Sequence, residues 1–343
     1  MKALVNTAPY VLELQEWPIP EYGPEDLLIR VKACAICGSD IKGYSGKTGR
    51  RQPPIIMGHE ASGVIEAMGG QVSGFAVGDR VCFDSTVYCR RCSYCMSGHA
   101  NLCKNRQVVG VSEGTYRRHG AMAEYVVVPY WIAVKMPDNL SFAQAALVET
   151  ASIGVHAANR TPLKLNDTVV IVGAGAVGLV TLQAIRLKGA GKVIVTDLAA
   201  SRLELARQLG ADVTIRSDRK DLLEALRQET GSDGADAVLE AVGIQPTMDI
   251  ALAITKDGGA LTLIGNVMPR VEMGLQSIVS REITIYGVCA SNEYAACVEL
   301  VASGRINVDP FISAYARLEE GQEVFDRLYK GVEDNLRTVF VFD

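Results

Sequence analysis

Residues 169–178 decide the fold, and they read Val169-Val170-Ile171-Val172-Gly173-Ala174-Gly175-Ala176-Val177-Gly178. The first four residues form a continuous β-branched run, which is typical of a buried parallel strand. The glycines then give the pattern G-x-G-x-x-G, and residues 176–188 follow with helical spacing. The stretch therefore predicts a strand, a tight glycine turn and a helix in direct succession.

This arrangement suits a bound dinucleotide. Gly173 permits the tight turn, Gly175 lets the backbone approach a pyrophosphate, and Gly178 lets the helix pack closely on the strand. The helix begins at Ala176 and Val177, where free N–H groups and the positive end of the helix dipole favour an anion. The sequence therefore predicts a dinucleotide site at this turn.

Asp197 lies 19 residues after the last glycine, at the end of the next predicted strand. A carboxylate there would accept hydrogen bonds from the ribose hydroxyls of the adenosine and repel a 2′-phosphate. We therefore expect NAD rather than NADP as the cofactor. Arg202 either lies near the adenosine end or is a solvated helix residue.

The predicted elements on either side of this motif define the fold class. Strands and helices alternate from about residue 150, which indicates a doubly wound parallel sheet. The predicted strands cover 193–196, 213–215, 237–241 and 260–264, and the helices cover 202–209 and 222–227. The first 145 or so residues instead contain short apolar segments separated by Pro and Gly pairs, which predict a β-rich domain. The chain is thus expected to be an α/β protein with two domains.

Composition narrows the possible functions. The chain has 343 residues, 48% of them hydrophobic and 21% charged, so a disordered scaffold is excluded. Its net charge of −5 argues against binding nucleic acid or an anionic membrane. The longest apolar run, residues 168–182, is shorter than the roughly 20 residues that span a bilayer. With no signal peptide in view, we expect a cytoplasmic protein.

Four of the nine cysteines fall within fifteen residues, and they are Cys89, Cys92, Cys95 and Cys103. Four thiolates in one short loop are the ligand set of a tetrahedral structural zinc, which leaves no open position for catalysis. The alternatives are an iron–sulfur cluster, for which the fourth spacing is wrong, and a chance grouping of thiols. The scattered cysteines at 34, 82, 289 and 297 are expected to be small buried residues.

A second candidate metal site comes from two separate segments. Cys37 begins the sequence Cys-Gly-Ser-Asp, and His59 and Glu60 follow Gly58. A thiolate, an imidazole and a carboxylate form the mixed ligand set of a catalytic zinc with an open position. Taken singly, Cys37 is more often a small core residue and His59 more often a hydrogen-bonded structural histidine.

The pattern Gly58-His-Glu-x2-Gly63-x5-Gly69-x2-Val72 resembles the signature of the zinc-containing alcohol dehydrogenases. Over essentially its whole length, the chain is similar to the medium-chain dehydrogenases and, among them, to the sorbitol (polyol) dehydrogenase branch. The resemblance implies a GroES-like catalytic domain, residues 1–148 completed by 286–343, and a Rossmann NAD-binding domain, residues 149–285. It also implies a homo-oligomer, which in this branch is usually a tetramer.

The resemblance assigns roles to residues by position. Cys37, His59 and Glu60 would hold the catalytic zinc, and Glu149 would ligate it directly or through water. Two zinc ions per chain and NAD would then support the oxidation of a secondary alcohol to a ketone. Ser39 would begin a path for the proton, and Lys42 would either finish that path or meet a cofactor phosphate.

Departures from the polyol pattern put sorbitol itself in doubt. Thr150 stands where the branch usually has Pro, and Ala290-Ser291 replace an Arg-Tyr pair that contacts the polyol. A polyol, a cyclitol or a sugar-derived alcohol is the expected small-molecule substrate. An amino alcohol of the threonine dehydrogenase type and a phosphorylated hexitol are the alternatives. Lys42, Lys47 and the pair Arg50-Arg51 could serve the phosphate, although such a run is usually a solvated loop. A protein that keeps the fold without catalysis is a further alternative.

Overall fold

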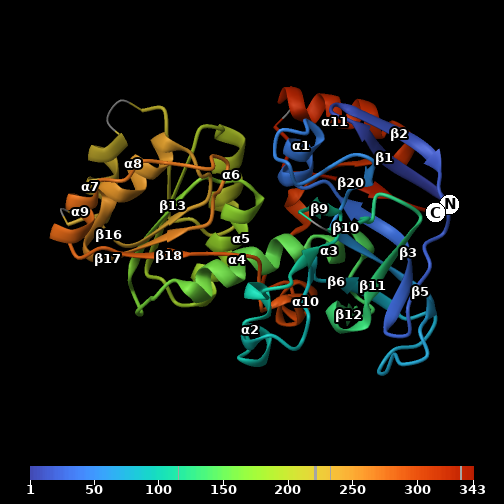
Figure 1. The fold of residues 1–343 in the computed structure, drawn as a ribbon. Coiled ribbons are helices and arrows are strands. Elements are labelled where there is room, and N and C mark those ends of the chain that lie inside the picture. The colour runs from blue at the N-terminus through green and yellow to red at the C-terminus, as the bar shows by residue number, and fades with distance from the viewer. Residues whose placement is uncertain (115, 220–221, 232, 333) are drawn as a thin grey trace. The chain divides into compact units, whose positions relative to one another are not determined.

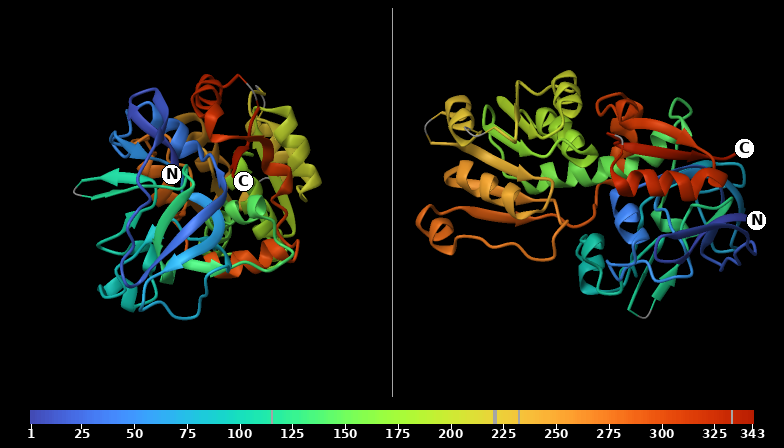
Figure 2. Two further views of the ribbon diagram at one scale, coloured as in Figure 1. Left: turned by 90° about the vertical axis from the view of Figure 1, so that its right-hand side faces the viewer. Right: turned by 90° about the horizontal axis from the view of Figure 1, so that it is seen from above.

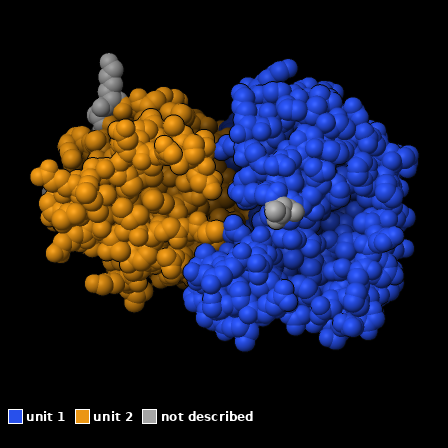
Figure 3. Space-filling model, in the orientation of Figure 1, with its two compact units in different colours: residues 1–149, 294–304, 308–343 blue, residues 150–293, 305–307 orange. Residues whose placement is uncertain are grey.

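The computed structural model describes residues 1–114, 116–219, 222–231, 233–332 and 334–343. The chain divides into two compact units, which Figure 3 shows in separate colours. The first unit comprises residues 1–149, 294–304 and 308–343, and the second comprises residues 150–293 and 305–307. Both chain termini therefore belong to the first unit (Figures 1 and 2).

The second unit is built on a six-stranded parallel sheet with the strand order β15-β14-β13-β16-β17-β18. Its strands are β13 (Thr168–Val172), β14 (Lys192–Asp197), β15 (Val213–Arg216), β16 (Ala235–Glu240), β17 (Thr255–Leu263) and β18 (Thr284–Gly287). The helices of this region are α4 (Val148–Arg160), α5 (Ala176–Leu187), α6 (Ala200–Gln208), α7 (Leu222–Thr230), α8 (Gln245–Ile254) and α9 (Leu275–Ser280). The sheet extends from β13 to one edge through β14 and β15 and to the other edge through β16, β17 and β18, which confirms the predicted doubly wound sheet.

Hydrophobic burial explains why this sheet forms. The strand residues Val170, Ile194 and Val238 occupy one row of the sheet and are fully buried. Each buried side chain of this size contributes roughly 1.5–3 kcal/mol. Gly178 allows α5 to approach β13, because a Cβ at this position would lie 2.0 Å from the carbonyl oxygen of Gly173.

The first unit contains a seven-stranded sheet in the order β12-β6-β5-β3-β20-β19, with β11 also paired to β3. These strands are β3 (Asp26–Ala35), β5 (Glu60–Met68), β6 (Arg80–Phe83), β11 (Tyr125–Pro129), β12 (Ala133–Lys135), β19 (Ile312–Ala316) and β20 (Arg337–Val341). Smaller sheets contain β1 (Lys2–Ala8), β2 (Val11–Glu16), β4 (Ile55–Ile56), β7 (Thr86–Val87), β8 (Gln107–Val108), β9 (Val111–Glu113) and β10 (Tyr116–Arg118). The expected β-rich domain is therefore present, and β20 brings the end of the chain against β3.

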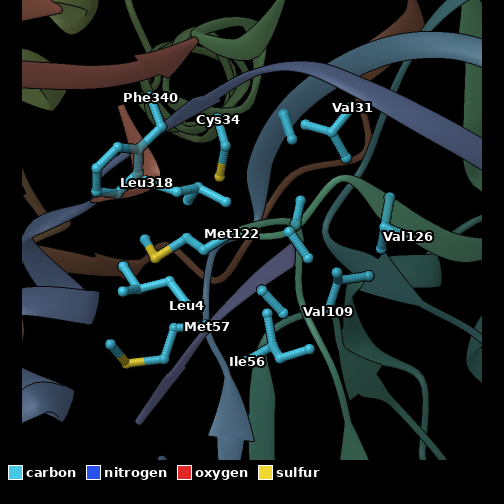
Figure 4. Packing of buried hydrophobic residues seen from close by; sticks show 14 of the residues in the cluster. Leu4, Val31, Cys34, Ile56, Met57, Val109, Met122, Val126, Leu318 and Phe340 are labelled. Carbon is cyan, nitrogen blue, oxygen red and sulfur yellow. The ribbon is translucent and has the colours of Figure 1, made fainter. Parts of the chain in front are cut away.

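Short helices complete the first unit. They are α1 (Gly38–Tyr44), α2 (Ser93–Met96), α3 (Phe142–Ala146), α10 (Tyr294–Ala302) and α11 (Gly321–Lys330), with 3₁₀ turns η1 (Ala100–Leu102), η2 (Tyr130–Ile132), η3 (Asp309–Phe311) and η4 (Leu318–Glu320). Figure 4 shows the core of this unit, where Leu4, Met57, Met122 and Phe340 pack together from distant parts of the chain. This core holds the end of β3 and the start of β5, where Cys37, His59 and Glu60 lie.

Candidate metal centres and cofactor site

The four-cysteine lobe lies between β7 and β8, on α2, η1 and the loops around them. The Sγ atoms of Cys92 and Cys95 are 3.5 Å apart, those of Cys92 and Cys103 are 3.9 Å apart, and those of Cys89 and Cys95 are 4.0 Å apart. Four sulfurs placed tetrahedrally about one zinc at ~2.3 Å would be ~3.8 Å from one another. The observed separations therefore fit a zinc ion.

Backbone amides support thiolate ligands in this lobe. The N–H groups of Cys89 and Asn105 each donate to Cys103 Sγ at 3.3 Å. Hydrogen bonds from the backbone N–H of Arg91 and from Asn105 lower the pKa of Cys89 to about 6. Because zinc binds the thiolate rather than the thiol, these donors prepare the loop for the metal.

Sheet pairing brings the mixed cluster together. Ala35 at the end of β3 pairs with Glu60 at the start of β5, so Cys37 and His59 meet just beyond the paired residues. The ligand atoms of Cys37, His59 and Glu60 lie within 4.8 Å of one another. Cys37 also caps α1, since its Sγ accepts from the amide of Ser39 at 3.5 Å. A sulfur, a nitrogen and a carboxylate oxygen that converge in this way fit a zinc ion.

Asp40 is a fully buried carboxylate behind His59. Its Oδ2 lies 3.4 Å from His59 Nδ1, and its Oδ1 accepts from Arg51 Nη2 at 2.8 Å. Burial alone would raise the pKa of Asp40, but His59 and Arg51 outweigh it and hold that pKa well below its usual range. Asp40 is therefore a fixed negative charge that orients the imidazole. The sequence motifs assign no role to Asp40, although Cys37-x-x-Asp40 has the spacing of a capping box.

The pKa of His59 is raised well above its usual value in the absence of metal. Burial opposes this increase, but the nearby Asp40 and Cys37 outweigh it.

Arg337 on β20 holds Glu60 by a bidentate ion pair. Its Nε donates to Glu60 Oε2 at 2.9 Å, and its Nη2 donates to Glu60 Oε1 at 3.1 Å. Burial opposes the charge of Arg337, but Glu60 and then Cys37 outweigh it and raise the pKa of the guanidinium. The sequence carries no signal for this contact, because a single arginine in a C-terminal strand matches no motif.

Glu149 lies in the first turn of α4 and is buried. Its Oε1 accepts from Ser85 Oγ at 2.9 Å. Burial raises the pKa of Glu149; His59 opposes this increase and Glu60 adds to it. Among the described residues, the ligand atoms of Cys37, His59 and Glu60 lie within 4.8 Å of one another, and Glu149 is not part of this group.

Two further candidates, Ser39 and Lys42, lie on α1 and are exposed. Ser39 Oγ accepts a hydrogen bond from Arg51 Nη2 at 3.3 Å. Partial desolvation lowers the pKa of Lys42, against the opposing effect of Cys37. Both side chains thus lie on the short helix that Cys37 caps.

The glycine turn of the second unit has the geometry of a phosphate cradle. Gly173 has a φ of +105°, a value that favours glycine, and no atom lies within 4 Å of a Cβ built at Gly175. Asp197 Oδ2 accepts from the amide of Ala174 at 2.7 Å, and Oδ1 accepts from the amide of Ala199 at 2.9 Å. The carboxylate is therefore fixed beside the turn. These residues fit a dinucleotide.

Two expectations from the sequence were wrong. Cys289 is exposed, whereas Cys34, Cys82 and Cys297 are buried as predicted. Cys289 follows the end of β18 and precedes Ala290, whose φ is +50°, so it lies in a turn rather than in the core. Arg51 is not a solvated loop residue, because its side chain is only 4% exposed and is paired with Asp40.

Comparisons with known proteins agree with this geometry. Residues 23–138 match the model of the alcohol dehydrogenase GroES-like domain, and residues 176–303 match that of the zinc-binding dehydrogenases. The chain therefore belongs to the family of zinc-dependent alcohol dehydrogenases. Within that family it belongs to the branch that contains the sorbitol dehydrogenases.

Several relatives are similar over nearly their full length. The chain is 36% identical to sorbitol dehydrogenase of Bacillus subtilis (strain 168), covering 95% of this chain and 93% of the relative. It is 35% identical to D-arabitol-phosphate dehydrogenase of Enterococcus avium, with 92% and 90% covered. A candidate zinc-binding dehydrogenase of Sinorhizobium meliloti 1021, solved bound to NADP, superimposes with a TM-score of 0.91 at 31% identity, covering 99% of both chains.

The comparisons show that the chain is an alcohol dehydrogenase and support zinc and a nicotinamide cofactor, as expected from the sequence. No helix among the described residues has the length and apolar character required to cross a membrane.

Proposed function

We propose that this enzyme oxidises a secondary alcohol of a polyol, cyclitol or sugar-derived substrate to a ketone and reduces NAD. The observation that carries the proposal is the convergence of Cys37, His59 and Glu60 within 4.8 Å. Zinc held there would supply a Lewis acid that lowers the pKa of an alcohol hydroxyl, and NAD would accept the hydride. The chain's own residues hold the metal, orient the alcohol and remove the proton.

Cys37 and His59 are the proposed sulfur and nitrogen ligands, and Glu60 and Glu149 are the proposed carboxylates. Glu60 reaches the other two ligands in the observed conformation, although Arg337 contacts both of its oxygens. Glu149 would act directly or through water. Asp40 keeps the ring of His59 in place by its contact with Nδ1.

Ser39 is the proposed first acceptor of the substrate proton, because its hydroxyl lies on α1 two residues from Cys37. A hydroxyl can accept one proton while it donates its own. Lys42, one turn further along the exposed side of α1, is the proposed last group in this path. A contact of Lys42 with a cofactor phosphate is the other role that its position allows.

Asp197 supports NAD as the preferred cofactor. Its two oxygens are held by the amides of Ala174 and Ala199. A 2′-phosphate placed near this carboxylate would meet a like charge, whereas two ribose hydroxyls would find acceptors. Gly173, Gly175 and the helix N-terminus at Ala176, Val177 and Gly178 would receive the pyrophosphate, and Arg202 would lie near the adenosine.

The basic run argues against a phosphorylated substrate. Arg51 is buried against Asp40, and Arg50 faces Glu113 with Nε 3.4 Å from Oε2. Arg51 is therefore held by Asp40 and unavailable to a phosphate, which supports an unphosphorylated alcohol as the proposed substrate. Phosphorylated polyols and L-threonine are the alternatives that the assay must test.

We also propose that the four-cysteine lobe holds a second, structural zinc, and that the enzyme is a cytoplasmic homotetramer. The proposed domains are residues 1–148 with 286–343 and residues 149–285. The lobe's sulfur separations of 3.5–4.0 Å support the metal. Family resemblance supports the tetramer.

NAD reduction over a panel of polyols, cyclitols, their phosphates and L-threonine tests this function. The highest kcat/KM should fall on an unphosphorylated polyol or cyclitol, with NAD preferred over NADP. Metal analysis of the purified enzyme should give two zinc ions per chain. Turnover with none of the alcohols, or zinc in the lobe alone, would contradict the proposal.

A further inference from the structure

Arg51 is a buried side chain that links two groups with roles in the proposed reaction, Asp40 and Ser39. Its Nη2 donates both to Asp40 Oδ1 at 2.8 Å and to Ser39 Oγ at 3.3 Å. One cation therefore contacts the carboxylate behind His59 and the hydroxyl proposed to receive the substrate proton.

Gly43 on α1 leaves space for the side chain of Arg51. A Cβ at Gly43 would lie 2.3 Å from Arg51 Cγ and 3.3 Å from Arg51 Cβ, so the arginine stem fills the space that any larger residue at 43 would occupy. Ser39, Asp40 and Gly43 thus form one continuous contact along the helix.

The backbone on either side of Arg51 is fixed by β9. The amide of Ser112 donates to the carbonyl of Arg50 at 3.2 Å, and the amide of Gln52 donates to Ser112 Oγ at 2.6 Å. The guanidinium therefore extends from an anchored segment.

The network also has an energetic cost. Arg51 Nε is buried and has no hydrogen-bond partner among the described residues. A buried donor left unsatisfied costs about 1–3 kcal/mol. An apolar side chain could fill the same space over Gly43 without that cost, so the distinct contribution of the arginine is its Nη2 contacts with Asp40 and Ser39.

We propose that Arg51 is a positioning residue that gives the Ser39 hydroxyl a single direction for proton transfer. A serine hydroxyl has one proton to donate and two lone pairs that accept. Arg51 occupies one lone pair, which leaves one lone pair for the substrate O–H and one proton for the next acceptor.

This inference rests on the proposed role of Ser39. In the forward reaction the substrate proton moves to Ser39 Oγ while the Ser39 proton moves to solvent or to the neutral amine form of Lys42, so Ser39 is unchanged overall. Arg51 gains and loses no proton, because a guanidinium stays charged in proteins.

The decisive experiment is a double-mutant cycle with Ser39→Ala, Arg51→Met and the double variant, all as zinc-loaded enzyme. Arg51→Met should lower kcat about 10- to 100-fold with KM for NAD changed less than about 2-fold, since acid–base assistance is typically worth 10²- to 10⁴-fold. In the Ser39→Ala background the same substitution should have almost no further effect, because the two residues act as a unit. Additive losses would overturn the inference.

A second measurement follows the proton itself. A pH-indicator dye in a stopped-flow instrument should show slower proton release when NAD and alcohol bind to Arg51→Met than to the unaltered enzyme. The solvent isotope effect on kcat should increase as well. A purely structural role would instead reduce zinc content or thermal stability and leave the rate of proton release per bound zinc unchanged.

Controls separate this inference from the proposed function. Arg50→Met removes a neighbouring arginine that faces Glu113 and should leave proton release unchanged. If Arg51→Met does not fold, Gly43→Ala, which displaces the arginine stem while keeping its charge, should reduce kcat more mildly. Unchanged kcat in Ser39→Ala would refute the proposed proton path, whereas a loss there without coupling to Arg51 would refute only the positioning role.

Discussion

The two metal-ligand clusters of this enzyme are assembled in opposite ways. The four sulfurs of the lobe come from residues 89–103, and three of these cysteines are partly exposed. The mixed cluster joins the end of β3 to the start of β5, and it is buried against Arg337, which follows Glu60 by 277 residues. Local chain geometry suffices to bring the four sulfurs together, whereas the mixed cluster needs a sheet to place its side chains.

The surroundings of the two clusters differ as much as their assembly. In the lobe, backbone amides donate to the sulfurs. In the mixed cluster, charged side chains surround the ligands, with Asp40 and Arg51 behind His59 and Arg337 against Glu60. Because buried charges are costly unless paired, the mixed cluster depends on each partner far more than the lobe does.

The largest effect should come from removing a ligand of the mixed cluster. Cys37→Ser should lower kcat by about 10³-fold or more, because metal activation of the hydroxyl depends on the ligand set. NAD binding, measured by fluorescence titration, should change little. Cys289→Ser, an exposed thiol outside both clusters, is the matched control. Retained turnover would mean that Cys37 is not a ligand of the catalytic metal.

The corresponding change in the lobe should act on stability instead. Cys92→Ser should reduce the zinc content from two ions per chain to one and lower the melting temperature by several degrees, since structural zinc contributes folding free energy. Turnover per remaining zinc should fall by less than about tenfold. A loss of turnover as large as that of Cys37→Ser would remove the distinction between the two clusters.

Arg337→Met tests how far the mixed cluster depends on charge pairing. The substitution leaves Glu60 buried without its bidentate partner, so the free energy of unfolding should fall by about 3–5 kcal/mol. Urea denaturation measures this change. The double variant Glu60→Gln/Arg337→Met removes both charges and should recover part of the loss. If Arg337→Met alone were as stable as the unaltered protein, the pair would be incidental.

Asp197→Ser tests the proposed cofactor site, whose glycine motif is contiguous in the sequence. Without the carboxylate, a 2′-phosphate no longer meets a like charge, so the NADP/NAD ratio of kcat/KM should rise about 10- to 100-fold, or ~1.4–3 kcal/mol. Steady-state kinetics with both cofactors measures the ratio. An unchanged ratio would show that Asp197 does not contact the adenosine ribose.

The smallest effect should come from a carboxylate–histidine pair away from both clusters. Glu293 Oε2 lies 2.8 Å from His156 Nδ1. Burial opposes ionisation of Glu293, but the contact with His156 outweighs it and lowers the pKa of Glu293 from 4.5 to about 2. Because the pKa of Glu293 is lower in the folded protein than in the unfolded chain, its ionised form stabilises the fold above about pH 4.5. This contribution is lost as the pH falls from about 4.5 towards 2.

Glu293→Gln should therefore cost about 1 kcal/mol at pH 6, after allowance for partial exposure, and less as the pH falls below 4.5. Urea denaturation at pH 6 and pH 3.5 compares the two conditions. A cost that grew on acidification would reverse the expected sign. The stability cost of Glu293→Gln should be the same with and without zinc, whereas the Asp40–His59 pair should be sensitive to the metal.

Local patterns were sufficient for five of the strands and three of the helices of the second unit, but they did not predict α8, α9 or β18. The predicted strand at residues 213–215, for example, is β15, Val213–Arg216. They also located the cysteine lobe, because its spacing within one loop already limits where the sulfurs can lie. The expectation for Cys289 failed because composition alone cannot show whether a small residue follows a strand end into a turn.

The sequence by itself determined the alternation of strands and helices in the second unit, the glycine turn with Asp197 and the grouping of four cysteines within residues 89–103. These features depend on contacts between near neighbours, for which spacing is a sufficient guide. Only the tertiary structure decided that Arg337 holds Glu60 and that Arg51 fills the space over Gly43 and contacts both Asp40 and Ser39. Such contacts depend on the register of paired strands and on the competition between desolvation and charge pairing, which no spacing along the chain records.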